Sequence, residues 1–480
     1  MRALFSLTFI FTALLSTAQS GDTAFIKTSL LKQYPVDTIY IRSINFEGNF
    51  KTKPELIKRE IPLQEGDTLA LAELDNRLNL TRQFLINLFL FNSVTITVVK
   101  VEGPYVDINI NMQERWYIWP IPIFELADRN FNQWWLTKDL GRTNYGFYMS
   151  AYNIRGVNET MKVTFVQGYT HRYEFDYKFP YINKSKTLGL NFNIKRTSNK
   201  EVWYDTRGSK LQFFSDSTNF NIRRFSTTAG FNIKPKYRIT NRIDVGYSNI
   251  KIGDTILTES LNPDYLKTGN VQKAIELSYT HIRDFRDYKG YPLTGFFLKS
   301  ELKNVGLDLM KGQNIVSLTT QYSKYHWFGK KYYGSFQLKG KVSNRDDQPY
   351  NQLQALGYKD IVRGYELYVI DGQHYGLFKG AVKRALLPQK EFFVDKIPAK
   401  QYKIFPVAAY VNLFYDMGYV SSTYNKNNQG IDENYLNNSL LLGYGVGLDF
   451  VFYYDRVFRF EYTINKETTS GLYVHFTYPI

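Results

Sequence analysis

From Tyr117 to the end of the chain, apolar residues alternate with polar ones at a period of two. In "RYEFDYKF" (residues 172–179) every second residue is aromatic and each residue between is charged. "GSFQLKGKV" (334–342) and "FRFEYTI" (458–464) follow a similar alternation. Because successive side chains of a β-strand point to opposite faces, this pattern predicts strands with one apolar and one polar face.

A soluble sandwich would have to cover so large an aromatic face with a second sheet, and the sequence offers no helices here as cover. A closed barrel turns the apolar face of every strand to lipid and the charged face to the lumen. The aromatic content supports this interpretation, since the chain holds 39 Tyr and 36 Phe. We therefore expect a transmembrane β-barrel over residues 115–480.

The alternating segments predict sixteen antiparallel strands, an even number that bacterial barrels prefer. The connections are mostly short on one side of the barrel, whereas the other side includes the long segments 197–222, 253–270, 344–373 and 421–438, an asymmetry expected of such barrels. The stretch "LQFFSD" (211–216) could add a hairpin outside the membrane. The expected strands are 117–126, 144–154, 159–168, 172–180, 187–197, 223–234, 242–252, 271–282, 296–304, 314–327, 331–343, 374–386, 405–420, 439–453, 456–465 and 470–478.

The N-terminus predicts export. Met1 and Arg2 precede an apolar run over residues 3–15 and then small residues, which is the pattern of a signal peptide over residues 1–20. No later apolar run approaches the roughly 18 residues of a membrane-spanning helix. The chain has no cysteine, which excludes disulfides, thiolate metal sites and a cysteine nucleophile.

Residues 38–114 predict a small α/β domain. A strand at 38–48 is followed by Thr52 and Glu55, whose spacing suggests a capping box opening a helix that runs through Glu60. A second helix is expected at 70–88, and strands at 94–103 and 105–114 complete the order β-α-α-β-β. This order resembles a POTRA domain, in which strand 94–101 or strand 38–46 would lie at the edge of a three-stranded sheet.

One POTRA unit before a sixteen-stranded barrel resembles the Omp85 superfamily of outer-membrane assembly and translocation proteins, of the BamA/TamA and surface antigen D15 type. Three motifs carry the resemblance. The first, Val362, Arg363, Gly364 and Tyr365, matches the family's VRGF/Y motif between strands 11 and 12. The second is the turn 283–295 between strands 8 and 9, with Arg283, Asp284, Pro292 and Gly295. The third is "FYDMG" (414–418) on strand 13, with Asp416 and Gly418.

The resemblance implies that the loop bearing Arg363 folds back into the barrel and that the arginine meets an acidic residue on the lumen wall. The alternation of strand 13 supplies a partner independently, because it turns Asn412 and Asp416 inward. Gly364 would permit the tight turn that presents the arginine. The alternative is an ordinary solvated arginine in a surface loop.

Two departures from the family's pattern bear on function. Assembly machines of the BamA type carry several POTRA units and this chain has one, which favours an accessory or client-specific role. The chain ends at Tyr478, Pro479 and Ile480 rather than on an aromatic residue. Even so, residues 470–476 resemble the C-terminal signal of barrel substrates.

Two prolines mark the seam between the first and last strands. The backbone nitrogens of Pro120 and Pro122 point to the same edge of strand 117–126. Because proline has no N–H, that edge lacks two neighbouring hydrogen-bond donors. Proline is tolerated only at the edges or bulges of a sheet, so we expect this edge to face the last strand, where Gly471 lies. Closure would then rest on few hydrogen bonds. The alternative places both prolines in a linker below the membrane.

No motif predicts an enzyme or a cofactor. A Gly-x-Ser-x-Gly elbow, a His-Glu-x-x-His helix and a phosphate-cradling glycine loop are all absent from the sequence. Ser470 and His475 would face opposite sides of one strand. The histidines lack the spacing of metal ligands: His171, His281, His326, His374 and His475.

The net charge of +16 is spread along the chain, without a cluster typical of nucleic-acid binding, so contact with anionic lipid headgroups is the expected use. We therefore expect a non-enzymatic protein of a Gram-negative-type outer membrane, with its N-terminal domain in the periplasm. It would insert β-barrel clients or translocate polypeptides. The expected partners are outer-membrane lipid, unfolded polypeptide clients and possible periplasmic or lipoprotein partners of the POTRA-like domain.

Two alternatives stay open: a secretion pore dedicated to one partner protein, and a passive channel for small solutes. A periplasmic domain whose strands can pair with incoming chains disfavours the passive channel, as does a loop that fills the lumen.

Overall fold

The structure is a computed structural model. It describes residues 19–20, 26–27, 37–126, 142–216, 218–258, 260–307, 314–393, 397, 402–423 and 434–477. Apart from Gln19 and Ser20, the expected signal peptide lies outside the described residues.

The N-terminal domain has the expected strand–helix–helix–strand–strand order, with short strands added. Its sheet has the order β2-β5-β6-β3-β4. The expectation of three strands is therefore wrong, because the short strands β2 and β4 add to the two edges. β4 pairs with the first residues of β3, and β2 pairs in parallel with the middle of β5. The elements are β2 (Ile26–Lys27), β3 (Thr38–Glu47), α2 (Pro54–Glu60), β4 (Thr68–Ala70), α3 (Leu71–Ile86), β5 (Phe91–Glu102) and β6 (Tyr105–Glu114).

Both helices of this domain cover one face of the sheet. Leu56 and Ile57 of α2 and Leu74 and Leu78 of α3 are buried against alternate residues of the strands, such as Ile96. The spacing of three or four residues along α3 brings these leucines onto one helix face. Burial of this apolar face holds the helices on the sheet.

The expected capping box is wrong. Lys53 is the N-cap of α2, and no side chain caps the helix. The hydroxyl of Thr52 donates instead to Glu114 at 2.5 Å, and the side-chain amide of Asn153 donates to Thr52 at 2.8 Å. Thr52 therefore joins the domain to the barrel rather than capping the helix.

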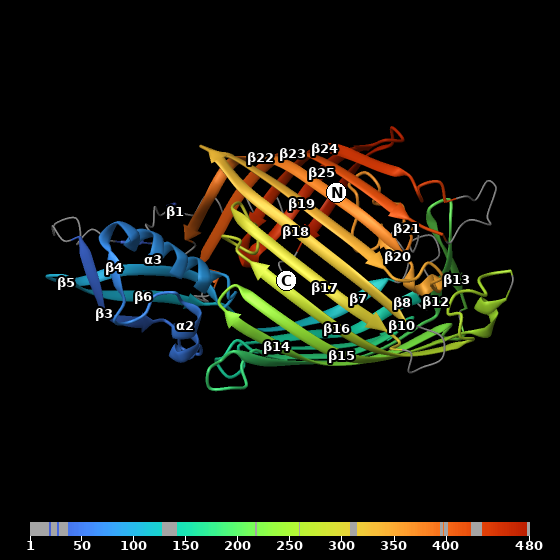
Figure 1. The fold of residues 1–480 in the computed structure, drawn as a ribbon, viewed down its shortest axis with the longest axis horizontal. Coiled ribbons are helices and arrows are strands. Elements are labelled where there is room, and N and C mark those ends of the chain that lie inside the picture. Colours follow the sequence, from blue (N-terminus) through green and yellow to red (C-terminus); the bar gives the residue numbers. More distant parts are fainter. Residues whose placement is uncertain are drawn as a thin grey trace.

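The C-terminal region forms the expected sixteen-stranded antiparallel barrel, confirmed to within a few residues at most strand ends; β22 extends seven residues further than expected (Figure 1). Each strand pairs with the next along the chain, apart from short excursions outside the wall. The barrel strands are β7 (Ile118–Leu126), β8 (Thr143–Tyr152), β9 (Thr160–Gly168), β10 (Thr170–Phe179), β11 (Leu188–Asn199), β14 (Ile222–Lys236), β15 (Ile239–Ile252), β16 (Val271–Asp284), β17 (Gly295–Val305), β18 (Ile315–Gly329), β19 (Tyr332–Ser343), β22 (His374–Phe393), β23 (Ile404–Ser421), β24 (Leu440–Phe452), β25 (Arg456–Asn465) and β26 (Ser470–Thr477).

The two faces of the barrel wall follow the alternation of the sequence. On β23, Leu413 and Tyr415 are exposed on the outer face, whereas Asn412 and Asp416 are buried inside. Because the period is two, every strand of the wall sorts its side chains in the same way.

The remaining elements lie at the end of the barrel away from the N-terminal domain, except β1 and η6. The expected additional hairpin is present as β12 (Glu201–Arg207) and β13 (Lys210–Ser215), at the right of Figure 1. Two short strands, β20 (Gln354–Leu356) and β21 (Ile370–Asp371), pair within the 344–373 loop. The others are η3 (Asp254–Leu257), η4 (Tyr350–Gln352), η6 (Tyr453–Asp455), and β1 (Gln19–Ser20), which pairs with the end of β22. Among the helices of the described residues, none is long and apolar enough to cross a membrane.

The N-terminal domain lies at one end of the barrel, at the left of Figure 1, and contacts its turns directly. The side-chain amide of Asn87, at the end of α3, donates to the carbonyl of Asp287 at 2.9 Å, and its oxygen accepts from the backbone of Lys289 at 2.8 Å. Arg115 pairs with Asp455 at 2.6 Å across the junction. The barrel turns that the domain contacts include 153–159, 180–187, 237–238, 285–294 and 453–455.

Candidate functional site in the barrel lumen

The loop between β19 and β22 carries Arg363 onto the inner wall of the barrel. Its guanidinium donates to both carboxylate oxygens of Asp416, from Nε at 2.9 Å and from Nη2 at 2.6 Å. The backbone N–H of Arg363 donates to the same carboxylate at 3.1 Å. Asp416 is fully buried, so the pair is a bidentate, charge-assisted contact shielded from bulk water.

Two further side chains, Glu461 and Phe414, contact the guanidinium of Arg363. Nη1 donates to Glu461 on β25 at 3.1 Å, and the guanidinium carbon lies 3.8 Å from the centre of the Phe414 ring. Glu461 is also buried. One arginine thus ties the loop to β23 and β25 together, through two carboxylates and a cation–π contact.

Small residues let the loop approach the wall closely. A Cβ at Gly418 would lie 2.5 Å from the side chain of Val362, and one at Gly443 would overlap the carbonyl oxygen of Arg363. Gly364 has a φ of +95°, a conformation that L side chains rarely adopt. Val362 and Tyr365 are buried in an apolar cluster with Leu356, Ile370, Tyr375, Leu377, Val420, Leu436 and Leu441. The loop is therefore packed as a core, not solvated.

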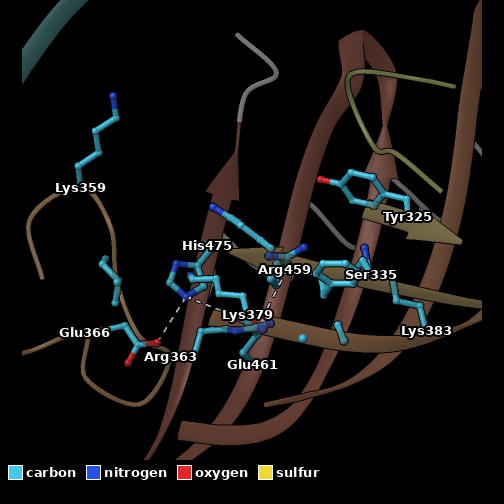
Figure 2. A pocket seen from close by; sticks show the side chains of 15 residues that line it. Tyr325, Ser335, Lys359, Arg363, Glu366, Lys379, Lys383, Arg459, Glu461 and His475 are labelled. Carbon is cyan, nitrogen blue, oxygen red and sulfur yellow. Dashed lines mark hydrogen bonds and ion pairs between the residues drawn. The ribbon is translucent and has the colours of Figure 1, made fainter. Parts of the chain in front are cut away.

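A second group of charged residues lies on the inner wall next to the Arg363 site. Arg459 on β25 donates to both oxygens of Asp449, at 2.7 and 3.1 Å. Figure 2 shows the loop residues Arg363 and Glu366 beside His475, Lys379 and Glu461 from the wall. Nε2 of His475 on β26 lies 3.3 Å from Glu461, so the last strand of the barrel faces the carboxylate that the loop arginine binds.

The turn between β16 and β17 brings only part of its motif together. Asp284 accepts two hydrogen bonds from Arg286, each of 2.8 Å, whereas Arg283 turns away and donates to His281 at 3.1 Å. Gly295 has a φ of +96° where a Cβ would overlap the carbonyl of Phe285. Pro292 lies within the turn. Tyr291 of this turn reaches into the barrel and donates to Asp449 at 2.6 Å.

The seam residues lie in strands. Pro120 and Pro122 pair with Met149 and Phe147 in an unbroken register between β7 and β8, and Gly471 pairs with Thr463 between β25 and β26. The alternative of a linker below the membrane is therefore wrong. β26 and β7 are neighbours in the sheet, but no residue register between them is defined among the described residues, whereas each is paired in register on its other side.

The two missing proline N–H groups belong to the edge of β7 that faces β26. In an antiparallel ladder, alternate residues direct their N–H groups to opposite neighbours. The register between β7 and β8 continues through both prolines without a shift. The backbone nitrogens of the two prolines must therefore point away from β8, since proline cannot donate to the ladder.

The β12–β13 hairpin crosses the mouth of the barrel opposite the N-terminal domain. The backbone N–H of Ser209, at its tip, donates to the Asn434 side chain at 2.7 Å, and Asn434 donates to the Thr206 carbonyl at 2.8 Å. Val369 of the 344–373 loop donates to the carbonyl of Ser209 at 3.0 Å. Ser209 and Asn434 are buried, so the hairpin is latched to two loops.

No group of three or more potential metal ligands is found in the part of the chain that the structure describes. The charged residues of the lumen are arranged as ion pairs between loop and wall. Such an arrangement holds a loop in place; it does not provide a nucleophile next to a base.

Sequence reasoning found Arg363 and Asp416 but missed Glu461 and His475. Both lie on the polar face of an alternating strand. Glu461 is opposite the aromatic residues of β25, and His475 is opposite Val474 and Phe476 of β26. Their nearness to the loop depends on the register between β23, β24 and β25, and no local sequence signal gives that register. The Ser209–Asn434 latch was missed for the same reason.

A POTRA-like domain joined to a sixteen-stranded barrel, with an arginine loop bound inside, defines a class of outer-membrane barrel proteins. Comparisons with known families agree. The Omp85 superfamily domain matches residues 153–476, and the POTRA family, described as surface antigen variable number repeat, matches residues 39–115. The chain belongs to the Omp85 superfamily. Membership implies an outer-membrane protein with its POTRA domain in the periplasm, and a role in polypeptide insertion or translocation.

Solved structures share the fold at low identity. BamA from Haemophilus ducreyi lacking POTRA domains 1–3 has a TM-score of 0.50 and 14% identity, covering 91% of this chain and 83% of that chain. CdiB from Escherichia coli has a TM-score of 0.52 and 12% identity, covering 91% of this chain and 75% of that chain. No curated protein matches the chain.

Proposed function

We propose that this protein inserts β-barrel clients into the outer membrane, without covalent chemistry, through the seam between β7 and β26. The observation that carries the proposal is the edge of β7 that faces β26, which contains two prolines and has no defined register with β26 among the described residues. A strand edge with unpaired backbone groups templates another strand, and the pairing depends little on side-chain sequence.

The blocked lumen supports a lateral route over an axial one. The 344–373 loop is packed against the inner wall, the POTRA domain contacts the periplasmic turns, and the latched hairpin crosses the extracellular mouth. These features also count against a passive channel for small solutes. One POTRA domain favours a restricted set of clients.

The coupling of loop and seam gives this role a mechanism. Arg363 binds Glu461 on β25, and His475 of β26 lies 3.3 Å from the same buried carboxylate. β26 stays paired with β25 when it separates from β7, so His475 and Glu461 move together. The loop, bound to Glu461 through Arg363, therefore stabilises the strand next to β26 without contacting the client.

A disulfide across the seam tests the proposal. The chain has no native cysteine, so Phe124→Cys on β7 and Val474→Cys on β26 introduce the only two thiols of the protein. We expect oxidation to abolish insertion of a barrel client into liposomes and reduction to restore it, with each single variant as control. Full activity of the oxidised double variant would overturn the lateral route.

A further inference from the structure

An apolar patch lies on the POTRA domain at the foot of the seam. Phe50, Trp116 and Ile118 line one shallow groove, and we call them the Phe50 patch. Phe50 is 96% exposed, and the other two are each nearly half exposed. A fully exposed phenylalanine beside two further apolar side chains marks a surface that contacts an apolar partner.

The loop that presents Phe50 is held rigidly. The carboxylate of Glu114 accepts from the backbone N–H groups of Lys51 and Thr52, at 3.1 and 2.7 Å. The backbone N–H of Lys53 donates to the Gly156 carbonyl of the barrel at 2.9 Å. Phe50 is thus fixed outward between anchored neighbours, at a set height relative to the barrel.

The patch continues the lipid-facing surface of the barrel. Ile118 is the first residue of β7 and lies on the same face as Phe124, which is 73% exposed on the outer wall. Elsewhere at the periplasmic end, the β18–β19 turn exposes Trp327, Phe328 and Tyr332 on that wall. Aromatic residues at this level form the interfacial girdle of membrane barrels. Phe50 and Trp116 extend the girdle from the barrel onto the POTRA domain.

The charges next to the patch fit a lipid headgroup region. Lys51 and Lys53 follow Phe50 in sequence, and both are exposed. Lysine beside aromatic side chains suits a membrane surface, where the rings enter the acyl boundary and the ammonium groups meet phosphates.

We propose that the Phe50 patch binds phospholipids of the periplasmic leaflet and so anchors the POTRA domain to the membrane beside the seam. The ring of Phe50 lies at the acyl boundary, and Lys51 and Lys53 face the lipid phosphates. This anchor fixes the POTRA domain next to the seam between β7 and β26, whichever polypeptide the protein handles.

Spin labelling of the full chain in bilayers tests the anchor. Phe50→Cys carries a nitroxide, and Val99→Cys, an exposed position on β5 outside the patch, carries the matched control. In phosphatidylcholine bilayers with phosphatidylglycerol, we expect collisions of the Phe50 label with oxygen to exceed those with a water-soluble nickel chelate several-fold. The Val99 label should show the reverse. Equal accessibility at both positions would overturn the proposal.

Two further arms separate the alternatives. If the Phe50 label becomes shielded only when an unfolded barrel polypeptide is added, the patch binds clients and the lipid assignment is wrong. In anionic bilayers, Lys51→Gln with Lys53→Gln should reduce the immersion of the label, and Lys58→Gln on α2 should not. An unchanged immersion in the double variant would reject the phosphate contacts.

Discussion

At the scale of single residues, Arg363 has more partners than its motif suggests. It binds the carboxylates of Asp416 and Glu461, and its guanidinium stacks on Phe414. Two buried carboxylates next to one arginine make the site sensitive to the loss of any member, because removal leaves an uncompensated charge.

A double-mutant cycle should detect this dependence. Arg363→Ala and Asp416→Ala should each lower the free energy of unfolding by about 3–5 kcal/mol, the usual cost of breaking a buried pair. The double variant should lose clearly less than the sum, since Arg363 and Asp416 no longer leave each other unpaired. Unfolding in urea, followed by the heat-dependent mobility of the barrel on gels, measures each value. Strict additivity would mean that the two residues do not interact.

A second residue-scale prediction concerns pH and the POTRA domain. Hydrogen bonds from Arg42 hold the pKa of Asp107 down at about 2. A depressed carboxyl pKa contributes stability above the unfolded value of about 3.9, and this contribution is lost as the pH falls toward 2. The melting temperature of the domain should therefore fall between pH 4 and pH 2. Arg42→Gln should flatten this dependence; an unchanged pH profile in the variant would contradict the assignment.

At the scale of elements, α3 fixes the POTRA domain to the barrel through Asn87. Asn87→Ala removes two hydrogen bonds of the β16–β17 turn, at a cost of about 1–3 kcal/mol. Amide hydrogen exchange in residues 285–294 should become faster. Asn79→Ala, on the exposed face of the same helix, is the matched control. Equal exchange in the two variants would show that Asn87 does not hold the turn.

The edge of β5 gives a second element-scale prediction. Among the described residues, β2 pairs only with Ile96 and Thr97 of this edge, and we expect the rest of it to pair with a client strand. Thr95 and Ile96 direct their N–H groups to opposite sides of β5. We expect proline at one of them to weaken client capture while the domain stays folded, and proline at the other to disturb the pairing with β6. Circular dichroism and client pull-down separate the two. Unchanged capture in both variants would exclude this edge.

Elements were predictable from the sequence where their cause is local. The sixteen strands follow from an alternation that each strand carries within itself. β22 extends to Phe393, well past the expected Leu386, because its pairing with β23 continues beyond the alternating segment. Thr52 was misread because its hydroxyl binds Glu114, a residue 62 positions away that competes with the local cap. β2 and β4 are too short for any periodic signal.

At the scale of the whole molecule, the two mouths of the barrel differ in what closes them. The periplasmic mouth faces a domain held by separate side-chain contacts at several turns. The extracellular mouth is crossed by one hairpin, whose latch joins Ser209 to Asn434 and to Val369. An axial path would require the hairpin to leave the 344–373 loop, whereas a lateral path would leave the latch intact.

A lock on the hairpin should therefore distinguish insertion from secretion. Ser209→Cys with Asn434→Cys places two thiols on neighbouring residues, which a hydrogen bond of 2.7 Å from the Ser209 backbone to the Asn434 side chain now joins, in a chain without other cysteines. If clients leave through the seam, the oxidised protein should insert a barrel client as fast as the reduced protein. A pore dedicated to secretion should stop on oxidation and recover on reduction. Transport measured in liposomes, with the seam pair at Phe124 and Val474 assayed in parallel, gives opposite patterns for the two routes. Loss of activity in the hairpin lock, together with full activity in the seam lock, would establish an axial path and overturn the proposed function.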